Sequence, residues 1–127
     1  MLDLHQSAAA GIIGLAVGDA LGVPVEFSDR ERLKKHPVTG MRSFGTHNQP
    51  AGTWSDDTSL ALCLAESLAD KGIDYADQAQ QFIAWKYSGK WTPHGRMFDI
   101  GNATGEAITR LLNGVNPLAA GPDDERA

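Results

Sequence analysis

Three stretches of the sequence gather oxygen-bearing side chains that could do chemistry. The densest is Ser55-Asp56-Asp57-Thr58, which opens an apolar segment. Mg²⁺ takes oxygen ligands, usually one or two carboxylates from any segment, so this run could serve a hard cation. The structural alternative is helix capping, because Ser, Asp and Thr are favoured in the first turn of a helix. A cap needs one such side chain and four stand here in a row, which favours a metal site.

The second stretch runs from Gly18 to Phe27 and contains two acids. Asp19 lies near the end of a predicted helix, where the helix dipole disfavours a carboxylate, and it could equally be a surface acid. Glu26 lies between Val25 and Phe27, and a carboxylate with apolar neighbours suits acid–base work. Spacing alone makes this a weak signal.

The third stretch is Asp99-Ile100-Gly101-Asn102. Either Asp99 or Asn102 could cap a helix that follows. Alternatively, Asp99 holds the hydroxyl groups of a ligand, and Gly101 lets that ligand approach the backbone because it has no Cβ. Both interpretations stay open at the level of the sequence.

The elements that must position these residues are predicted to be helices. Apolar residues recur at helical spacing, and no segment keeps the period of two that marks a half-buried strand. Gly, Pro and the N-cap Asp74 set the boundaries. The predicted helices cover 4–21, 55–71, 74–89 and 102–113, and a long loop over 27–53 includes one helical turn at 29–35. We expect an all-α fold, one domain over 1–127 and a flexible polar tail over 117–127.

Two of these helices are predicted to be buried. The apolar stretch of the first, Ala8 to Gly18, is too short to span a bilayer and leads directly into Asp19. Glycines inside this helix weaken it, and close packing against another backbone would compensate. The second helix is apolar on nearly all sides, which is typical of a core helix.

The composition excludes several classes of protein. The formal net charge is -5, and Lys and Arg are scattered and outnumbered, so no nucleic-acid surface is expected. The single cysteine, Cys63, excludes a disulfide framework, favours a cytoplasmic location and is expected to pack as a small core residue. The four histidines are dispersed and show no spacing typical of metal ligands.

Together, the three stretches resemble the conserved blocks of the ADP-ribosylglycohydrolase family. Residues 11–27 are similar to its opening signature, 52–58 to its first metal motif and 98–102 to its third block. The bacterial dinitrogenase-reductase-activating glycohydrolases are the most similar branch. The resemblance implies an orthogonal all-α helical bundle, here truncated. It also implies a Mg²⁺-dependent hydrolase that cleaves the bond between ADP-ribose and a modified protein side chain or small molecule.

The resemblance also implies roles for individual residues. The family's ligands for a centre of two Mg²⁺ ions match Ser55, Asp56 and Asp57. Its glutamate near the scissile bond, which acts in acid–base catalysis, positioning or gating, matches Glu26. Its ADP-ribose-binding loop matches Asp99, Gly101 and Asn102. Asp19 matches the signature without an assigned role. The expected partners are an ADP-ribosylated protein or an ADP-ribose-containing small molecule, with no nucleic acid and no membrane span.

One departure from the family pattern bears on activity. Family members are more than twice this length and complete the metal shell from a later Asp-x-Asp-Thr motif, which does not occur after Asp57. The sequence therefore predicts an incomplete, N-terminal portion of the domain. Two alternatives stay open. One is a non-catalytic relative that binds ADP-ribose or serves as a crystallin-like structural protein. The other is an unstable remnant with exposed apolar faces.

Overall fold

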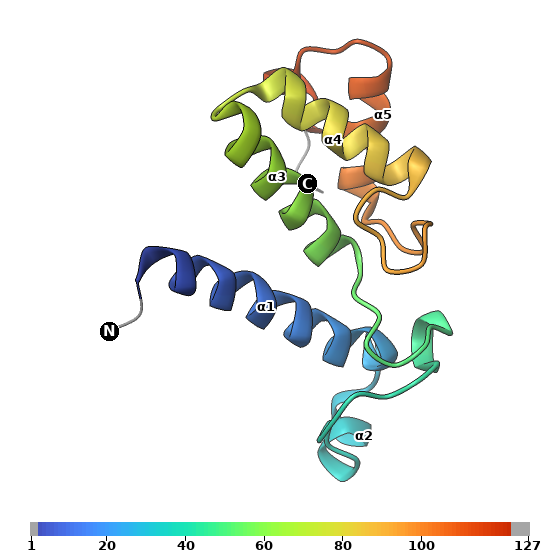
Figure 1. The fold of residues 1–127 in the computed structure, drawn as a ribbon. Helices are drawn as coiled ribbons and strands as arrows, with labels where there is room; N and C mark the ends of the chain where they lie inside the picture. The colour runs from blue at the N-terminus through green and yellow to red at the C-terminus, as the bar shows by residue number, and fades with distance from the viewer. Residues whose placement is uncertain (1–2, 123–127) are drawn as a thin grey trace. The chain divides into compact units, whose positions relative to one another are not determined.

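The chain is built from helices and loops in the computed structural model, which describes residues 3–122 (Figure 1). The elements are, in order, α1 (Leu4–Gly22), η1 (Val23–Val25), α2 (Arg30–Lys35), η2 (Gly45–His47), α3 (Asp56–Lys71), α4 (Tyr75–Ser88), α5 (Asn102–Leu112) and η3 (Pro117–Ala119). Over that range the only extended pairing is an isolated bridge between Phe44 and Gln49. The predicted all-α class is confirmed. The chain divides into two compact units, Met1–Thr58 and Ser59–Ala127.

In unit 1, α1 begins with a capping box. The Asp3 carboxylate accepts from the backbone N–H of Gln6 at 2.7 Å, and the Gln6 side chain accepts from the N–H of Asp3 at 3.2 Å. Of the 19 residues of α1, only Ala20 is buried, while Ile13 and Val17 are 63% and 45% exposed. The prediction of a buried helix is therefore wrong for the described part of the chain. An apolar sequence favours burial, but burial also needs an element to pack along the helix.

The glycines of α1 do not serve close packing in this structure. A Cβ added at Gly11, Gly14 or Gly18 would meet no atom within 4 Å among the residues that the structure describes. The predicted contact with another backbone is therefore not found there.

The segment Leu4–Val25 is 22 residues long, and by length and composition alone it could cross a membrane. The prediction of a stretch too short for a bilayer rested on residues 8–18 and does not hold for the longer helix that forms. Core helices of soluble proteins can have the same length and apolar composition, so these features are weak evidence for a membrane span. Of the apolar stretch in this helix, 17% is buried.

After α1, the long predicted loop of unit 1 folds back on itself. Asp29 caps α2, since its carboxylate accepts from the backbone N–H groups of Glu31 and Arg32 at 2.8 and 3.2 Å. The same loop contains a second helical turn, η2, which was not predicted. This turn contacts η1. This contact brings residues 45–47 beside 23–26, about twenty positions earlier in the chain.

Positive charge is concentrated in and after α2, contrary to the prediction that Lys and Arg are scattered. Five of the 11 Lys and Arg residues fall within positions 30–42. Arg32, His36 and Arg42 line a cleft of about 400 Å³. The Arg42 guanidinium donates to the carbonyls of His36 and Pro37 at 3.1 and 2.7 Å, which fastens the C-terminal end of α2 to the loop that follows.

The core of unit 2 lies where α3, α4 and α5 meet (Figure 1). Cys63, Trp85 and Ile108, one from each helix, are buried, as predicted for Cys63. Partly buried apolar side chains that pack against them are Leu60, Phe82, Ile83, Met97 and Ile100. This core holds α5 and the loop that precedes it in place within the unit.

The buried face of α3 is made of small residues rather than leucines. Ser59, Cys63 and Ser67 are buried, whereas Leu64 and Leu68 are 37% and 43% exposed. On this face the Cys63 thiol contacts α4, where it donates to the carbonyl of Gln81 at 3.6 Å. The prediction that this helix is buried on nearly all sides is correct for one face only.

Burial also determines the reactivity of the cysteine. Loss of solvent raises the pKa of the Cys63 thiol to about 11, although Lys90 opposes the shift. Because the thiolate is the nucleophile, we expect iodoacetamide to label the native chain very slowly near about pH 7 and faster as the pH approaches 11. Urea should expose the thiol and restore ordinary labelling. Mass spectrometry of the native and urea-treated chain tests this, and fast native labelling at neutral pH would contradict the buried placement.

The loop after α4 is tied back to α3. The Glu66 carboxylate accepts from the Trp91 indole N–H at 2.5 Å and from the Lys90 ammonium at 3.1 Å, and these bonds lower the pKa of Glu66. The loop starts at Gly89, where φ is 71° and an added Cβ would lie 2.1 Å from the carbonyl oxygen of Gly95. Glycine is therefore required for this turn.

The chain after α5 continues in an ordered way. The Arg110 guanidinium donates to the carbonyls of Ala119 and Gly121 at 2.9 and 2.7 Å, and Ala120 is buried. The stretch predicted as a flexible tail, 117–127, therefore begins with a hydrogen-bonded 3-10 turn. Residues 123–127 lie outside the described range.

Candidate active site

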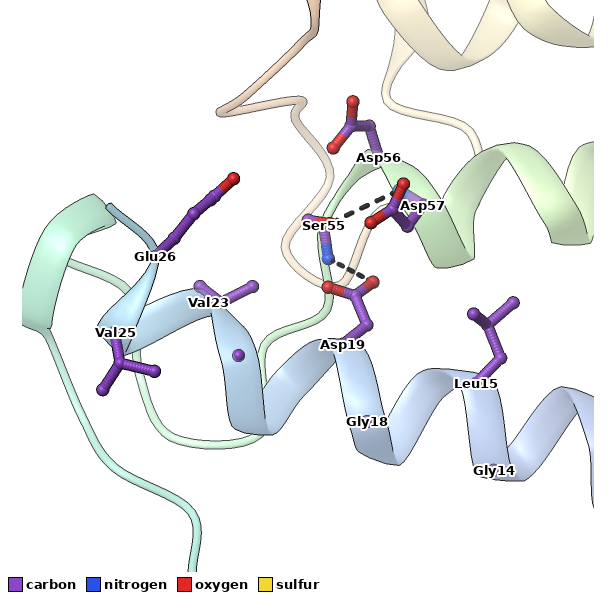
Figure 2. Close-up of a pocket in the computed structure, with 11 residues that line it drawn as sticks. Gly14, Leu15, Gly18, Asp19, Val23, Val25, Glu26, Ser55, Asp56 and Asp57 are labelled. Carbon is purple, nitrogen blue, oxygen red and sulfur yellow. Dashed lines mark hydrogen bonds between the residues drawn. The ribbon is translucent and has the colours of Figure 1, made fainter. Parts of the chain in front are cut away.

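An open cleft of about 580 Å³ in unit 1 collects the acids that the sequence singled out there (Figure 2). Apolar and glycine positions of α1 and η1 form part of its lining. Its polar lining consists of Asp19, Glu26, Ser55, Asp56 and Asp57. No Lys, Arg or His belongs to the lining formed by the described residues, so the charge of this cleft is negative. Such a cleft attracts cations and disfavours anions.

Asp19 anchors the beginning of α3. Its Oδ2 accepts hydrogen bonds from the backbone N–H groups of Ser55 and Thr58, at 2.9 and 3.1 Å, and from the Thr58 hydroxyl at 2.6 Å. A residue of α1 thus supplies acceptors for N–H groups that a helix N-terminus leaves without partners. The positive end of the α3 dipole also offsets the unfavourable position of an acid near the end of α1. This capping role could not be assigned from the sequence.

The residues at the start of α3 have two roles: some cap the helix, and some line the cleft. The Ser55 hydroxyl accepts from the backbone N–H of Asp57 at 3.3 Å, so Ser55 and Asp19 both act as caps. Asp56 and Asp57 are the first two residues of α3, and both line the cleft, the former half-buried and the latter exposed. The structure therefore combines the two interpretations of this run, because the caps and the cleft-lining carboxylates are neighbours.

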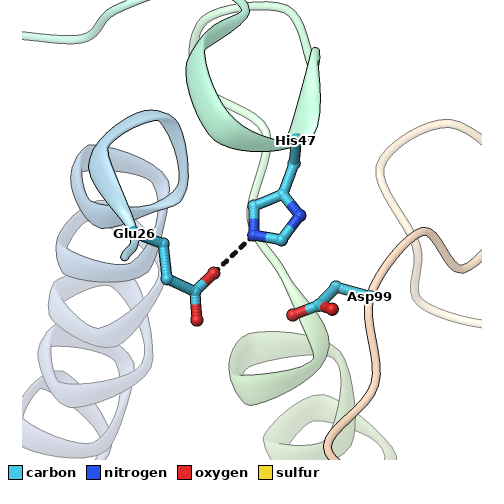
Figure 3. A group of neighbouring side chains, drawn as sticks. All are labelled: Glu26, His47 and Asp99. Atoms are coloured by element: carbon cyan, nitrogen blue, oxygen red, sulfur yellow. Dashed lines mark hydrogen bonds and ion pairs between the residues drawn. The ribbon is translucent and has the colours of Figure 1, made fainter. Parts of the chain in front are cut away.

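Glu26 has a partner that sequence reasoning missed. Its Oε2 lies 2.5 Å from Nε2 of His47 (Figure 3). The His47 side chain is 13% exposed and that of Glu26 is 40% exposed. The ring of Phe27 lies 6.2 Å from the His47 ring, measured between centroids. No motif spacing signals this pair, because the two residues are 21 positions apart and meet only through the contact of η1 with η2.

The third predicted group, Asp99, Gly101 and Asn102, belongs to unit 2. Gly101 is the N-cap of α5 and no side chain bonds to that helix end, so the prediction that Asp99 or Asn102 acts as the cap is wrong. The φ of Gly101 is -63°, and an added Cβ would be 3.7 Å from Thr104 Oγ1, an ordinary contact. No contact described within unit 2 requires glycine there, and the close approach of a ligand stays a prediction.

Helices around an acidic, hydroxyl-bearing cleft define an all-α protein with a site suited to a hard cation. A sequence profile of the ADP-ribosylglycohydrolase family matches residues 1–126. The chain belongs to the ADP-ribosylglycohydrolase family. The predicted family resemblance is thereby confirmed.

Three relatives show the extent of the similarity. The ADP-ribosylarginine hydrolase Tri1 of Pseudomonas putida is 44% identical over 83% of this chain and 28% of its own length. The enzyme of the same name from Serratia proteamaculans is 41% identical over 84% and 29%. The ADP-ribosyl-[dinitrogen reductase] glycohydrolase of Rhodospirillum rubrum is 33% identical over 87% and 36%.

A solved structure shares the fold of this chain. An "ADP-ribosylglycohydrolase-related protein complex" superposes with a TM-score of 0.65 at 38% identity, over 90% of this chain and 35% of the other. The chain thus spans about a third of the length of the curated relatives and of the solved chain that it matches.

Proposed function

We propose that this chain carries metal ligands and a catalytic carboxylate of a hydrolase that removes ADP-ribose from a modified protein side chain. One observation carries the proposal: Asp19, Glu26, Asp56 and Asp57 line one cleft that includes no cationic side chain among its described lining residues. The relatives named as ADP-ribosylarginine hydrolases support it, and they favour arginine as the modified residue. The single buried cysteine is compatible with a cytoplasmic setting.

The donor set fits Mg²⁺. Ser55, Asp56 and Asp57 offer a hydroxyl and two carboxylates, the hard oxygen ligands that this ion prefers, and Mg²⁺ commonly keeps several waters besides. Asp19 serves the site indirectly, because its charge lies against the N-terminal end of α3, which would otherwise repel a cation. When bound, the metal would orient the ribose hydroxyls and a water molecule and stabilise developing charge.

The chain's own residues would act on the glycosidic bond as follows. Glu26, at the edge of the cleft, takes a proton from the water that attacks the anomeric carbon of the ribose. The bond from that carbon to the side-chain nitrogen breaks, and the nitrogen leaves with its electron pair and gains a proton from solvent. Glu26 then returns the proton taken from the water to solvent. Positive charge that develops on the ribose is favoured by the negative lining of the cleft. In unit 2, Asp99, Gly101 and Asn102 would contribute to binding ADP-ribose.

An assay of the 127-residue chain tests the proposal. Peptides carrying ADP-ribose on arginine or on serine are incubated with the chain in Mg²⁺ and, separately, in EDTA, and free ADP-ribose is measured by mass spectrometry. We expect release that needs Mg²⁺ and is faster from arginine than from serine, but slow, because the Asp-x-Asp-Thr ligands that the family pattern implies do not occur after Asp57. Glu26→Gln, which preserves the size of the side chain, should remove the activity.

Calorimetry with ADP-ribose distinguishes the competing outcomes. Binding of ADP-ribose without release from any peptide would favour a non-catalytic binding protein of the same family. The absence of both ADP-ribose binding and ADP-ribose release would contradict the proposal. Release that is equally fast in EDTA would leave a hydrolase but would refute the metal assignment.

A further inference from the structure

The segment that carries Glu26 is clamped by the turn around η2. The Thr46 hydroxyl donates to the carbonyl oxygen of Glu26 at 2.6 Å, from 20 positions further along the chain. The ends of the turn are closed by the backbone N–H of Phe44, which donates to the carbonyl of Gln49 at 2.6 Å. The Thr46 hydroxyl and the His47 imidazole, both from this one short turn, therefore contact the segment that carries Glu26.

This clamp is built at a cost in backbone conformation. Phe44 and Asn48 have φ values of 66° and 52°, in the region where side chains are disfavoured. Gly45, with φ 61°, could not be replaced, because a Cβ there would lie 2.0 Å from the carbonyl oxygen of Pro24. Residues held in such conformations cluster at functional sites. Phe44 and Asn48 flank η2, and His47 is the last residue of this turn.

Glu26 needs such a partner because of its surroundings. Asp19, Asp56 and Asp57 line the same cleft, and repulsion among like charges favours rotamers that turn Glu26 out into solvent. A donor from His47 Nε2 opposes this by holding Oε2. Among the described residues no hydrogen-bond partner is found for the other oxygen, Oε1, so it is left for proton transfer.

We propose that His47 is the positioning residue of the catalytic carboxylate: the η2 clamp presents its Nε2–H to Glu26 Oε2 and keeps Oε1 directed for reaction. This inference rests on the proposed hydrolase function. His47 acts through Glu26, and the ring of Phe27 lies 6.2 Å from the imidazole, measured between centroids. The role requires a donor at the position of Nε2, and only a side chain of matching reach can replace it.

The first test needs no activity. Long-range proton–nitrogen NMR spectra of the 127-residue chain report the state of each histidine ring, and His47→Gln identifies the His47 signals. Glu26→Ala should shift the Nε2 resonance of His47 and leave that of His36, an exposed histidine in the other cleft, unchanged. A His47 resonance that does not respond to Glu26→Ala would overturn the positioning role.

The second test uses two variants that differ in reach. Gln can place an amide N–H near the position of Nε2, whereas Asn is too short. We expect His47→Asn to lower kcat about 10–100-fold with little change in KM, as for loss of a group that orients a catalytic residue. His47→Gln should restore most of kcat. Equal loss in both variants, together with a lowered thermal transition, would mark His47 as merely structural.

The two tests separate the inference from the function on which it rests. If the unsubstituted chain releases no ADP-ribose while the His47 signal still depends on Glu26, the proposed function is wrong but the hydrogen bond between His47 and Glu26 is supported. If the chain is active and His47→Asn is as active as the unsubstituted chain, the positioning role fails and the function remains.

Discussion

Asp57→Ala is expected to reduce Mg²⁺-dependent release of ADP-ribose by more than about 100-fold, because losing even a residue that only orients a metal ligand costs about 10–100-fold. Asp57 is exposed at the start of α3, and its carboxylate has no hydrogen-bond partner among the described residues. Its removal should therefore cost the fold only about 0.3–1 kcal/mol of helix-dipole stabilisation. Calorimetric titration with Mg²⁺ and the peptide assay measure the two effects separately.

Asp70→Ala is the matched control for this change. Asp70 is an exposed aspartate in the last turns of the same helix, so the substitution removes an equal charge without touching the cleft. We expect unchanged Mg²⁺ affinity and unchanged release of ADP-ribose. If Asp57→Ala bound Mg²⁺ as tightly as Asp70→Ala does, Asp57 would not be a ligand.

Asp19→Ala should have the largest effect on stability, about 2–4 kcal/mol, because a carboxylate that caps a helix and accepts charge-assisted hydrogen bonds is lost. Three donors lose their acceptor at once: the N–H groups of Ser55 and Thr58 and the Thr58 hydroxyl. Ser55 should then lose its fixed place at the start of α3, and Mg²⁺ affinity should fall with it. Urea denaturation followed by circular dichroism gives the free energy of unfolding.

Asp74→Ala provides the comparison for Asp19. The Asp74 carboxylate also caps a helix, accepting from the N–H groups of Ala76 and Asp77 at 3.0 Å each, but these donors are its close neighbours in sequence. We expect this local cap to contribute about 0.5–2 kcal/mol. If Asp19→Ala lowered the free energy of unfolding no more than Asp74→Ala does, the hydrogen bonds from α1 to the start of α3 would contribute no more than a local cap.

The helix boundaries could be predicted because their causes lie within a few residues. Asp74 was predicted as an N-cap and accepts from the backbone N–H groups two and three positions later. Gly89 ends α4 with a left-handed φ, a conformation that glycine tolerates better than other residues. The turn at 29–35 appears as α2, with Asp29 as its cap. The run Ser55-Asp56-Asp57-Thr58 was recognisable for the same reason.

Burial was predicted less well, because it depends on which elements meet. The apolar composition of α1 favours a core helix, yet of the 19 residues of this helix only Ala20 is buried. On α3 the buried stripe is Ser59, Cys63 and Ser67, two of them polar, so the hydrophobicity of the individual residues does not predict it. A helix presents several faces, and the neighbouring element selects one of them.

The sequence alone therefore predicted the helices, the caps that bond to near neighbours, the acids at 55–58 and the family motifs. The two interactions that organise the cleft were not predicted. Asp19 bonds to residues 36 and 39 positions away, and Glu26 bonds to a histidine 21 positions away. Such pairs have no periodicity, since their spacing is set by the path of the intervening loop. They exist only once η1 and η2 are in contact and α3 begins beside the end of α1.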